Sequence, residues 1–203
     1  EFRRVLFRSA SGANPVHTYT GVGIYTAVVT AANDVSSLST TTVVTITPGP
    51  LASFELQAAS PQTAGVPFPI TIRAIDAYGN TVTDFNDTVD ISDSTGAISP
   101  LAATLLNGTA TRNFTVTRAT SPDFDTILAE YTTGAPITGT VEVEIRPAAP
   151  HLLTVTVAST SLDICETTIV SGTLVDRWNN PVPGEQVRLQ VVGGRARLSP
   201  SSD

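Results

Sequence analysis

The sequence predicts an all-β protein built from tandem β-sandwiches, of which the first and the last are incomplete. Threonine accounts for 32 of the 203 residues, and both Thr and Val favour strands. Apolar residues alternate with other residues over many short stretches, which is the period of a half-buried strand. One stretch also recurs 100 residues further along the chain, and this indicates a repeated structural unit.

The composition and the charge argue against two kinds of partner. The net charge is −7, with 11 Arg and no Lys, whereas a nucleic-acid partner requires a basic surface. No run of 18 apolar residues is present, so we expect no membrane-spanning helix. Cys165 is the only cysteine and therefore cannot form an intramolecular disulfide, so the sandwiches must be held together by packing alone.

Two proline-containing joints, residues 47–50 and 146–150, divide the chain. Proline restricts φ, so short joints of this kind act as semi-rigid spacers. We therefore expect the end of a first sandwich at 11–48, a complete sandwich at 50–146, and the first half of another at 150–203. The Arg- and Phe-rich residues 1–10 are interpreted as non-native or linker sequence, and residues 201–203 in the same way.

Alternating apolar residues predict the strands of the central segment, which number about seven. They are marked by Phe54, Leu56 and Ala58; Phe68, Ile70, Ile72 and Ala74; Val89 and Ile91; Phe114 and Val116; Ile127, Ala129 and Tyr131; and Val141, Val143 and Ile145. Turn residues separate these stretches at 78–80, 95–96, 107–108 and 133–134. The connections are too short for the helical crossovers that join parallel strands, so we expect antiparallel sheets.

A shift of 100 residues, made without a gap, aligns the central and C-terminal segments. Residues 75–82 then lie over 175–182, Pro50 over Pro150, and Ala58 over Ala158. The matches fall at turns and strand ends, where a shared backbone would place them. We therefore predict that the C-terminal segment is a second copy of the central one, ending about halfway.

The repeated stretch predicts a structural corner at the end of a strand. Its residues are Asp76, Tyr78, Gly79 and Asn80 in one copy and Asp176, Trp178, Asn179 and Asn180 in the other. Gly79 and Asn179 are expected to adopt positive φ, which Gly does freely and Asn tolerates. The aspartate is expected to accept backbone N–H bonds across the turn, and the aromatic residue to pack at the sandwich edge. Trp178 has the alternative of stacking on a sugar.

Three sets of residues resemble known modules of exported bacterial proteins. Residues 63–68, 74–80, 96–100 and 107–110 resemble bacterial immunoglobulin-like modules, and residues 170–176, 180–184 and the expected strand 187–191 resemble the first half of an invasin/intimin-type (group 1) Ig-like domain. In the latter, Cys165-Glu166-Thr167 replaces a glycine-containing turn. Residues 14–19, 23–29 and 32–34 resemble the C-terminal part of a PKD (polycystic kidney disease) domain. These resemblances imply tandem Ig-like sandwiches, and they carry little information on function because such modules have many roles.

Catalytic residues are not apparent in the sequence. His17 and His151 lie beside prolines at expected strand starts, where packing or turn roles are the usual ones, and no Ser-His-Asp or Cys-His set falls within one complete segment. Cys165 has acidic neighbours and no basic one, so we expect a small, partly buried side chain rather than a reactive thiol.

Acidic residues offer weak candidates for a calcium site, namely Asp84, Asp87, Asp123 and Asp125. The series Asp84, Asp87, Asp90 and Asp93 recurs at every third position, so its members cannot all converge, and the compact calcium-loop pattern is absent. A solvated strand face is the alternative that we favour, and no cofactor is expected otherwise.

The leading functional interpretation is a non-catalytic, extracellular stalk or spacer of a bacterial surface or secreted protein. Its partners would be neighbouring modules of the same polypeptide, and its ligand a host surface, matrix or polysaccharide. The alternative is a set of accessory modules that position the catalytic domain of a secreted hydrolase on polysaccharide or protein. The rest of the open reading frame would distinguish these two.

Overall fold

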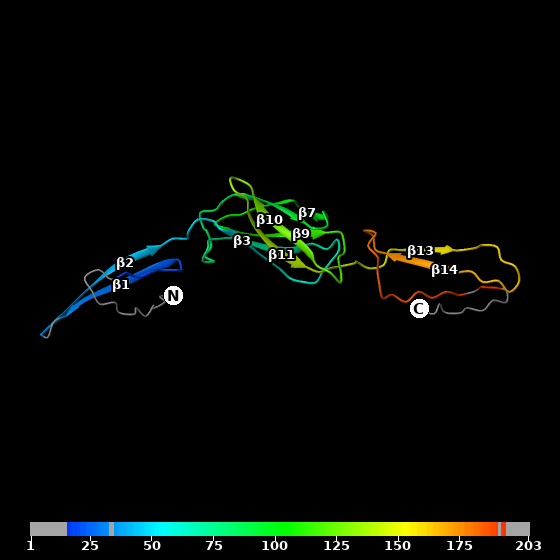
Figure 1. Cartoon of the computed structure of the whole chain (residues 1–203), viewed down its shortest axis with the longest axis horizontal. Helices are drawn as coiled ribbons and strands as arrows, with labels where there is room; N and C mark the ends of the chain where they lie inside the picture. The colour runs from blue at the N-terminus through cyan, green and yellow to red at the C-terminus, as the bar shows by residue number, and fades with distance from the viewer. Residues whose placement is uncertain (1–15, 33–34, 191, 194–203) are drawn as a thin grey trace.

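The computed structural model describes residues 16–32, 35–190 and 192–193, and within these ranges the chain is all-β, with no helix. Three parts follow one another in sequence order along the long axis of the molecule (Figure 1). They are an N-terminal hairpin, a central unit spanning residues 51–146, and a C-terminal hairpin. Residues 47–50 form the first joint between these parts and residues 146–150 the second.

The central unit has two four-stranded antiparallel sheets that enclose one hydrophobic core. Their strand orders are β11-β10-β6-β8 and β3-β5-β9-β7. The bounds are β3 (Ser53–Ala58), β5 (Phe68–Ile75), β6 (Thr88–Asp93), β7 (Ile98–Ser99), β8 (Ala102–Thr104), β9 (Thr109–Val116), β10 (Asp125–Tyr131) and β11 (Ile137–Val143). This arrangement is sandwich-like, and the expectation of an all-β fold is confirmed.

The alternation of side chains along the strands explains why the core forms where it does. On β5, Phe68, Ile70, Ile72 and Ala74 are all buried, while the residues between them are exposed or half-buried. Successive side chains of a strand point to opposite faces, so every second residue enters the core. The strands predicted from alternation in residues 54–145 are all present.

One short pair of strands is parallel, contrary to the antiparallel expectation. The strands β4 (Gln62–Thr63) and β12 (Ile145–Arg146) pair in parallel, with Gln62 opposite Ile145. The two strands lie near the start and the end of the central unit. The whole unit therefore serves as the crossover connection between them, and the shortness of the individual loops does not prevent the pairing.

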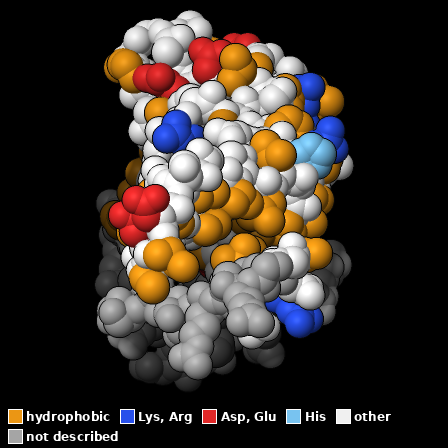
Figure 2. Space-filling model, turned by 90° about the vertical axis from the view of Figure 1, so that its right-hand side faces the viewer, with side chains coloured by type: hydrophobic (Ala, Val, Ile, Leu, Met, Phe, Trp, Pro, Cys, Tyr) orange, Lys and Arg blue, Asp and Glu red, His pale blue; other side chains and the backbone are white. Residues whose placement is uncertain are grey.

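The two hairpins have few buried side chains. The N-terminal hairpin pairs β1 (Gly23–Ala32) with β2 (Ser37–Ile46), and the C-terminal hairpin pairs β13 (Leu152–Val157) with β14 (Val170–Val175). All six residues of β13 are exposed. Figure 2 views the molecule from the end that carries the C-terminal hairpin, and it shows hydrophobic side chains gathered on the surface at that end.

The strand expected at 187–191 is not present in its described part, residues 187–190. Val191 lies outside the described residues, as do residues 1–15, 33–34 and 194–203, on which parts of the PKD and linker interpretations rest. A strand needs a neighbouring strand to satisfy its backbone N–H and C=O groups. Residues 187–190 pair with no other described strand, so their apolar alternation alone does not produce one.

The central and C-terminal segments share backbone hydrogen bonds, so the predicted repeat is present. The gapless shift of 100 residues between the two segments is nevertheless wrong for the first strand of each. The bridge from Ile75 to Thr81 has its counterpart from Val175 to Pro181, at a shift of 100. In contrast, the Ala52 N–H donates to Ile75 and the His151 N–H donates to Val175, so the first strands match at a shift of 99. Pro50 therefore corresponds to Ala149 rather than to Pro150, and the C-terminal segment carries one extra residue between its two strands.

Candidate functional site: the repeated corners and the joints

A buried aspartate organises the corner that follows β5. Asp76 is 3 % exposed, and its Oδ1 accepts the backbone N–H groups of Tyr78 and Asn80, each at 2.9 Å. The Asn80 side-chain amide also donates to Asp76 Oδ2 at 3.0 Å. Gly79 has φ of +80°, as the sequence predicts, and this lets the chain reverse within the turn.

The corner after β14 has the same geometry. Asp176 is 2 % exposed, and its Oδ1 accepts the N–H groups of Trp178 at 2.8 Å and Asn180 at 2.9 Å. The Asn180 amide donates to Asp176 Oδ2 at 2.8 Å. Asn179 has φ of +66°, which Asn tolerates better than most residues with a β-carbon. The two corners therefore have the same backbone geometry and the same hydrogen bonds around the aspartate.

Each corner aspartate also holds the joint that precedes its own part of the chain. The Gly49 N–H of the first joint donates to Asp76 Oδ2 at 2.9 Å, and the Ala148 N–H of the second joint donates to Asp176 Oδ2 at 2.9 Å. A carboxylate that accepts several backbone N–H groups forms strong, charge-assisted bonds. Each joint is consequently tied to the part that follows it.

Each corner asparagine reaches in the opposite direction, to the part that precedes it. At the second joint, Asn180 Nδ2 donates to the Thr117 carbonyl at 2.8 Å, and its Oδ1 accepts the Ala119 N–H at 2.9 Å. At the first joint, Asn80 Nδ2 donates to the Thr20 carbonyl at 3.1 Å, and its Oδ1 accepts the Val22 N–H at 3.4 Å.

The pattern of these bonds is the same at both joints. One carboxamide bonds the C=O of a residue and the N–H of the residue two positions later, as a neighbouring strand would do. The bonds of the second joint are shorter, and Asn180 is only 6 % exposed. At the first joint an open hollow of about 510 Å³ lies between the hairpin and the central unit, lined by Val22, Ile46, Asn80 and their neighbours.

The hydrogen bonds stabilise the ionised form of both aspartates. The Asn80 side chain, followed by the Gly49, Asn80 and Tyr78 N–H groups, lowers the pKa of Asp76 to about 2. Burial alone would raise the pKa of Asp176, but the bonds from Asn180, Ala148 and Trp178 hold it below its ordinary value. Both corners therefore carry a full negative charge at neutral pH.

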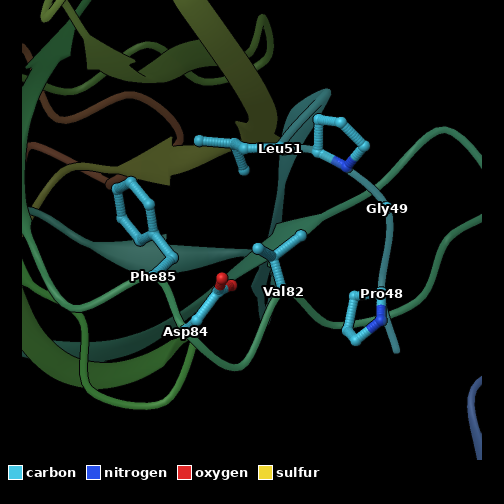
Figure 3. A pocket seen from close by; sticks show the side chains of 7 residues that line it. Pro48, Gly49, Leu51, Val82, Asp84 and Phe85 are labelled. Carbon is cyan, nitrogen blue, oxygen red and sulfur yellow. The ribbon is translucent and has the colours of Figure 1, made fainter. Parts of the chain in front are cut away.

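A second hollow beside the first joint does not contain a catalytic group of residues. Its volume is about 460 Å³, and it is lined by Pro48, Gly49, Pro50, Leu51, Val82, Asp84 and Phe85. Figure 3 shows Asp84 as the one carboxylate among apolar side chains. This lining has neither a nucleophile nor a basic partner for the carboxylate, so it offers no proton relay.

The four calcium candidates have different surroundings. Among the described residues no group of three or more His, Cys, Asp or Glu side chains is arranged to hold a metal ion. Asp125 is wholly buried, and its Oδ1 accepts the Ser94 N–H and hydroxyl groups. Asp87 accepts the Tyr131 hydroxyl group at 2.7 Å. Asp84 and Asp123 are exposed.

Cys165 differs from its prediction, because its side chain is exposed rather than partly buried. Its φ is +73°, the same as that of Gly65 one repeat earlier. The turns around them are also alike, since Val66 N–H donates to Thr63 and Glu166 N–H donates to Asp163, both at 3.1 Å. The chain therefore keeps the glycine turn with a residue that has a β-carbon.

The two histidines and the two corner aromatics lie at separate places. The His17 ring packs edge-on against Tyr19, with centroids 4.4 Å apart, while the His151 N–H donates to Val175. Tyr78 is 71 % exposed, whereas Trp178 is 40 % exposed and lies against Gly65 of the central unit. The predicted packing role thus fits Trp178 better than Tyr78.

Sequence reasoning found the corner residues but missed their contacts across the joints. Thr20, Val22, Thr117 and Ala119 take part through backbone atoms, which no side-chain pattern reveals. One signal for these contacts was present in the sequence, namely the recurrence of Asn at 80 and 180. The aspartate and the residue with positive φ already define the turn, so the asparagine is not needed for the turn itself.

No protein-family model and no curated protein matches this chain. Among the described residues, no helix has the length and apolar character needed to cross a membrane.

Proposed function

We propose that this chain is a non-catalytic, extracellular stalk region of a bacterial surface or secreted protein, built from tandem Ig-like modules. In this proposal the N-terminal hairpin is the end of a PKD-like module, the central unit is a complete Ig-like module, and the C-terminal hairpin begins an invasin/intimin-type module. Its role is to hold a partner-binding domain at a fixed distance from the cell.

The observation that supports the proposal is the recurrence of one joint structure. At both joints an aspartate accepts an N–H group from the joint, and an asparagine bonds the C=O and N–H groups of the preceding module. Modules joined by a linker alone move independently. Repeated bonds between modules restrict that motion, as a stalk requires and an independent enzyme domain does not.

Small-angle X-ray scattering of the full chain tests the proposal. A stalk should give an elongated particle with one narrow distribution of maximum dimension, unchanged across temperatures below the melting transition. A broad distribution, or a compact particle, would contradict the proposal.

Retention of the full chain on insoluble polysaccharide would favour the accessory role in a hydrolase. A pull-down with cellulose and chitin measures this directly. We expect the chain to remain in the supernatant, because Tyr78 belongs to the corner at the first joint, whereas Trp178 lies against Gly65 at the second.

A further inference from the structure

Among the described residues, the second joint has a contact that the first joint does not share. A β-carbon built on Gly65 would lie 2.5 Å from Trp178 Cε2 and 2.7 Å from Cζ2, and closer still to Nε1. Carbon atoms in contact are separated by about 3.5–4.0 Å. The edge of the indole ring therefore occupies the space in which any other residue at position 65 would place its side chain.

The turn that carries Gly65 lies beside the bonds of Asn180. The Gly65 N–H donates to the Val116 carbonyl at 2.8 Å, and the next residue, Thr117, accepts the Asn180 amide. Hydrogen bonds and ring contact thus form one continuous surface between the central unit and the corner that follows it.

We propose that Gly65 forms a seat for the aromatic residue of the next module, and that the missing β-carbon determines which module fits there. The partner of this surface is a module with an aromatic residue two positions after its corner aspartate, as Trp178 follows Asp176. The inference rests on the proposed function, because a seat between modules has meaning only in a chain of modules.

The same position one repeat later supports the role of glycine in specificity. Cys165 has the φ of Gly65 and the same turn hydrogen bond, so the backbone is preserved while a β-carbon is added. A module placed after this turn could not seat an aromatic ring in the pose of Trp178. A turn with Gly at this position thus accepts an aromatic ring from the next module, whereas a turn with Cys does not. The backbone of the turn is the same in both.

Trp178 is the only tryptophan, so its fluorescence reports on the seat in the full chain. The test variant is Gly65→Asn, because Asn tolerates positive φ and adds a side chain. The matched control is Gly96→Asn, at which φ is +68° and no atom lies within 4 Å of an added β-carbon. Both variants carry the same kind of backbone cost, and only the first obstructs the ring.

We expect Gly65→Asn to shift the emission of Trp178 to longer wavelength and to shorten its slow anisotropy decay. The acrylamide quenching constant should rise roughly twofold, because Trp178, now 40 % exposed, becomes fully exposed. Gly96→Asn should leave all three quantities at their wild-type values. The proposal is overturned if Gly65→Asn leaves them unchanged, or if the control moves them equally.

Trp178→Ala provides a second test if Gly65→Asn does not fold, because Trp178→Ala leaves the glycine turn intact. Its measurement is small-angle X-ray scattering of the full chain. We expect a wider spread of maximum dimension than in the wild type, and an unchanged spread overturns the seat. The wild-type curve separates the two proposals. A broad wild-type distribution contradicts the stalk, whereas a narrow one that neither variant broadens contradicts only the seat.

Discussion

At the scale of single residues, two buried aspartates of the central unit have opposite effects on stability. Asp76 is surrounded by N–H donors that favour its charge. Asp125 is wholly buried, and its Oδ2 has no hydrogen-bond partner within the described part of the chain. Burial, together with the charge of Asp93, raises the pKa of Asp125. The corner aspartate thus stabilises the fold when ionised, and the core aspartate when protonated.

The first prediction concerns the dependence of stability on acid at the corner. The pKa of Asp76 is about 2 in the folded chain and 3.8 ordinarily, so its contribution is complete above the higher value and is lost as the pH falls toward the lower. Asp76→Asn cannot titrate and faces Gly49 with an amide that donates. We expect its melting temperature to lie several degrees below the wild type at pH 7.

Calorimetric melting curves of the two proteins between pH 7 and pH 2 measure this effect. The difference in melting temperature should narrow as the pH falls below about 4, where the unfolded aspartate takes up its proton first. Asp123→Asn, at an exposed position, should follow the wild type throughout. Parallel curves for Asp76→Asn and the wild type would show that the carboxylate contributes nothing.

The second prediction has the opposite sign. Because the pKa of Asp125 is raised by burial and by Asp93, its stabilising contribution is full below the unfolded value of 3.8 and is lost as the pH rises through the folded value. Asp125→Asn keeps an oxygen to accept the Ser94 hydrogen bonds and carries no charge. We expect the variant to melt a few degrees higher than the wild type at pH 7.

Urea unfolding at pH 7 and at pH 3 checks the second prediction. The gain in free energy of unfolding should be present at the higher pH and absent at the lower one, with the slope against urea unchanged. A variant that is less stable at both pH values would mean that the buried Asp125 side chain is needed as a carboxyl group, whatever its charge.

At the scale of elements, residue periodicity predicted strands whose side chains enter the core. It failed at 187–190, where the formation of a strand depends on a pairing partner. Alternation located β5, which pairs with β3 and β9 and whose residues Ile70 and Ile72 are buried in the core. The same alternation at 187–190 produced no strand, since no strand of the described part of the chain pairs with it. A side-chain pattern reports on burial, but a strand also requires hydrogen-bond partners from elsewhere in the chain.

The corner was predictable because its constraints lie within five consecutive residues. An aspartate at the strand end and a residue tolerant of positive φ at 79 or 179 suffice to define it. The shift of one residue in the first strand was not predictable, because Pro50 and Pro150 align by identity while the backbone matches Pro50 to Ala149. Identities at isolated positions, here also Ala58 with Ala158, cannot distinguish these two registers.

At the scale of the whole molecule, the two joints have the same pattern of hydrogen bonds, but the contacts of the second joint are stronger. Both use an asparagine as a substitute for a neighbouring strand, but Asn180 is nearly buried and Asn80 is only half-buried. The second joint adds the contact of Trp178 with Gly65, whereas Tyr78 remains mostly exposed. The chain should therefore bend more easily at the first joint than at the second.

The third prediction follows from this inequality. Asn180→Ala removes bonds of 2.8 and 2.9 Å to Thr117 and Ala119, and leaves half-buried backbone groups without these partners. Asn80→Ala removes bonds of 3.1 and 3.4 Å that are already exposed to water, and exchange with water makes their net contribution small. We expect Asn180→Ala to loosen its joint markedly and Asn80→Ala to have a small effect.

Residual dipolar couplings of backbone amides measure this loosening, since each part of a rigid rod shares one alignment. In Asn180→Ala the couplings of β13 and β14 should shrink relative to those of β5 and β9, while the exposed Asn113→Ala on β9 should preserve the wild-type ratio. Chemical shifts within β13 and β14 separate a loosened joint from local unfolding, because only the latter moves them toward random-coil values. Equal effects of Asn80→Ala and Asn180→Ala would contradict the ranking of the joints, because exposure and bond length would then not govern their stiffness.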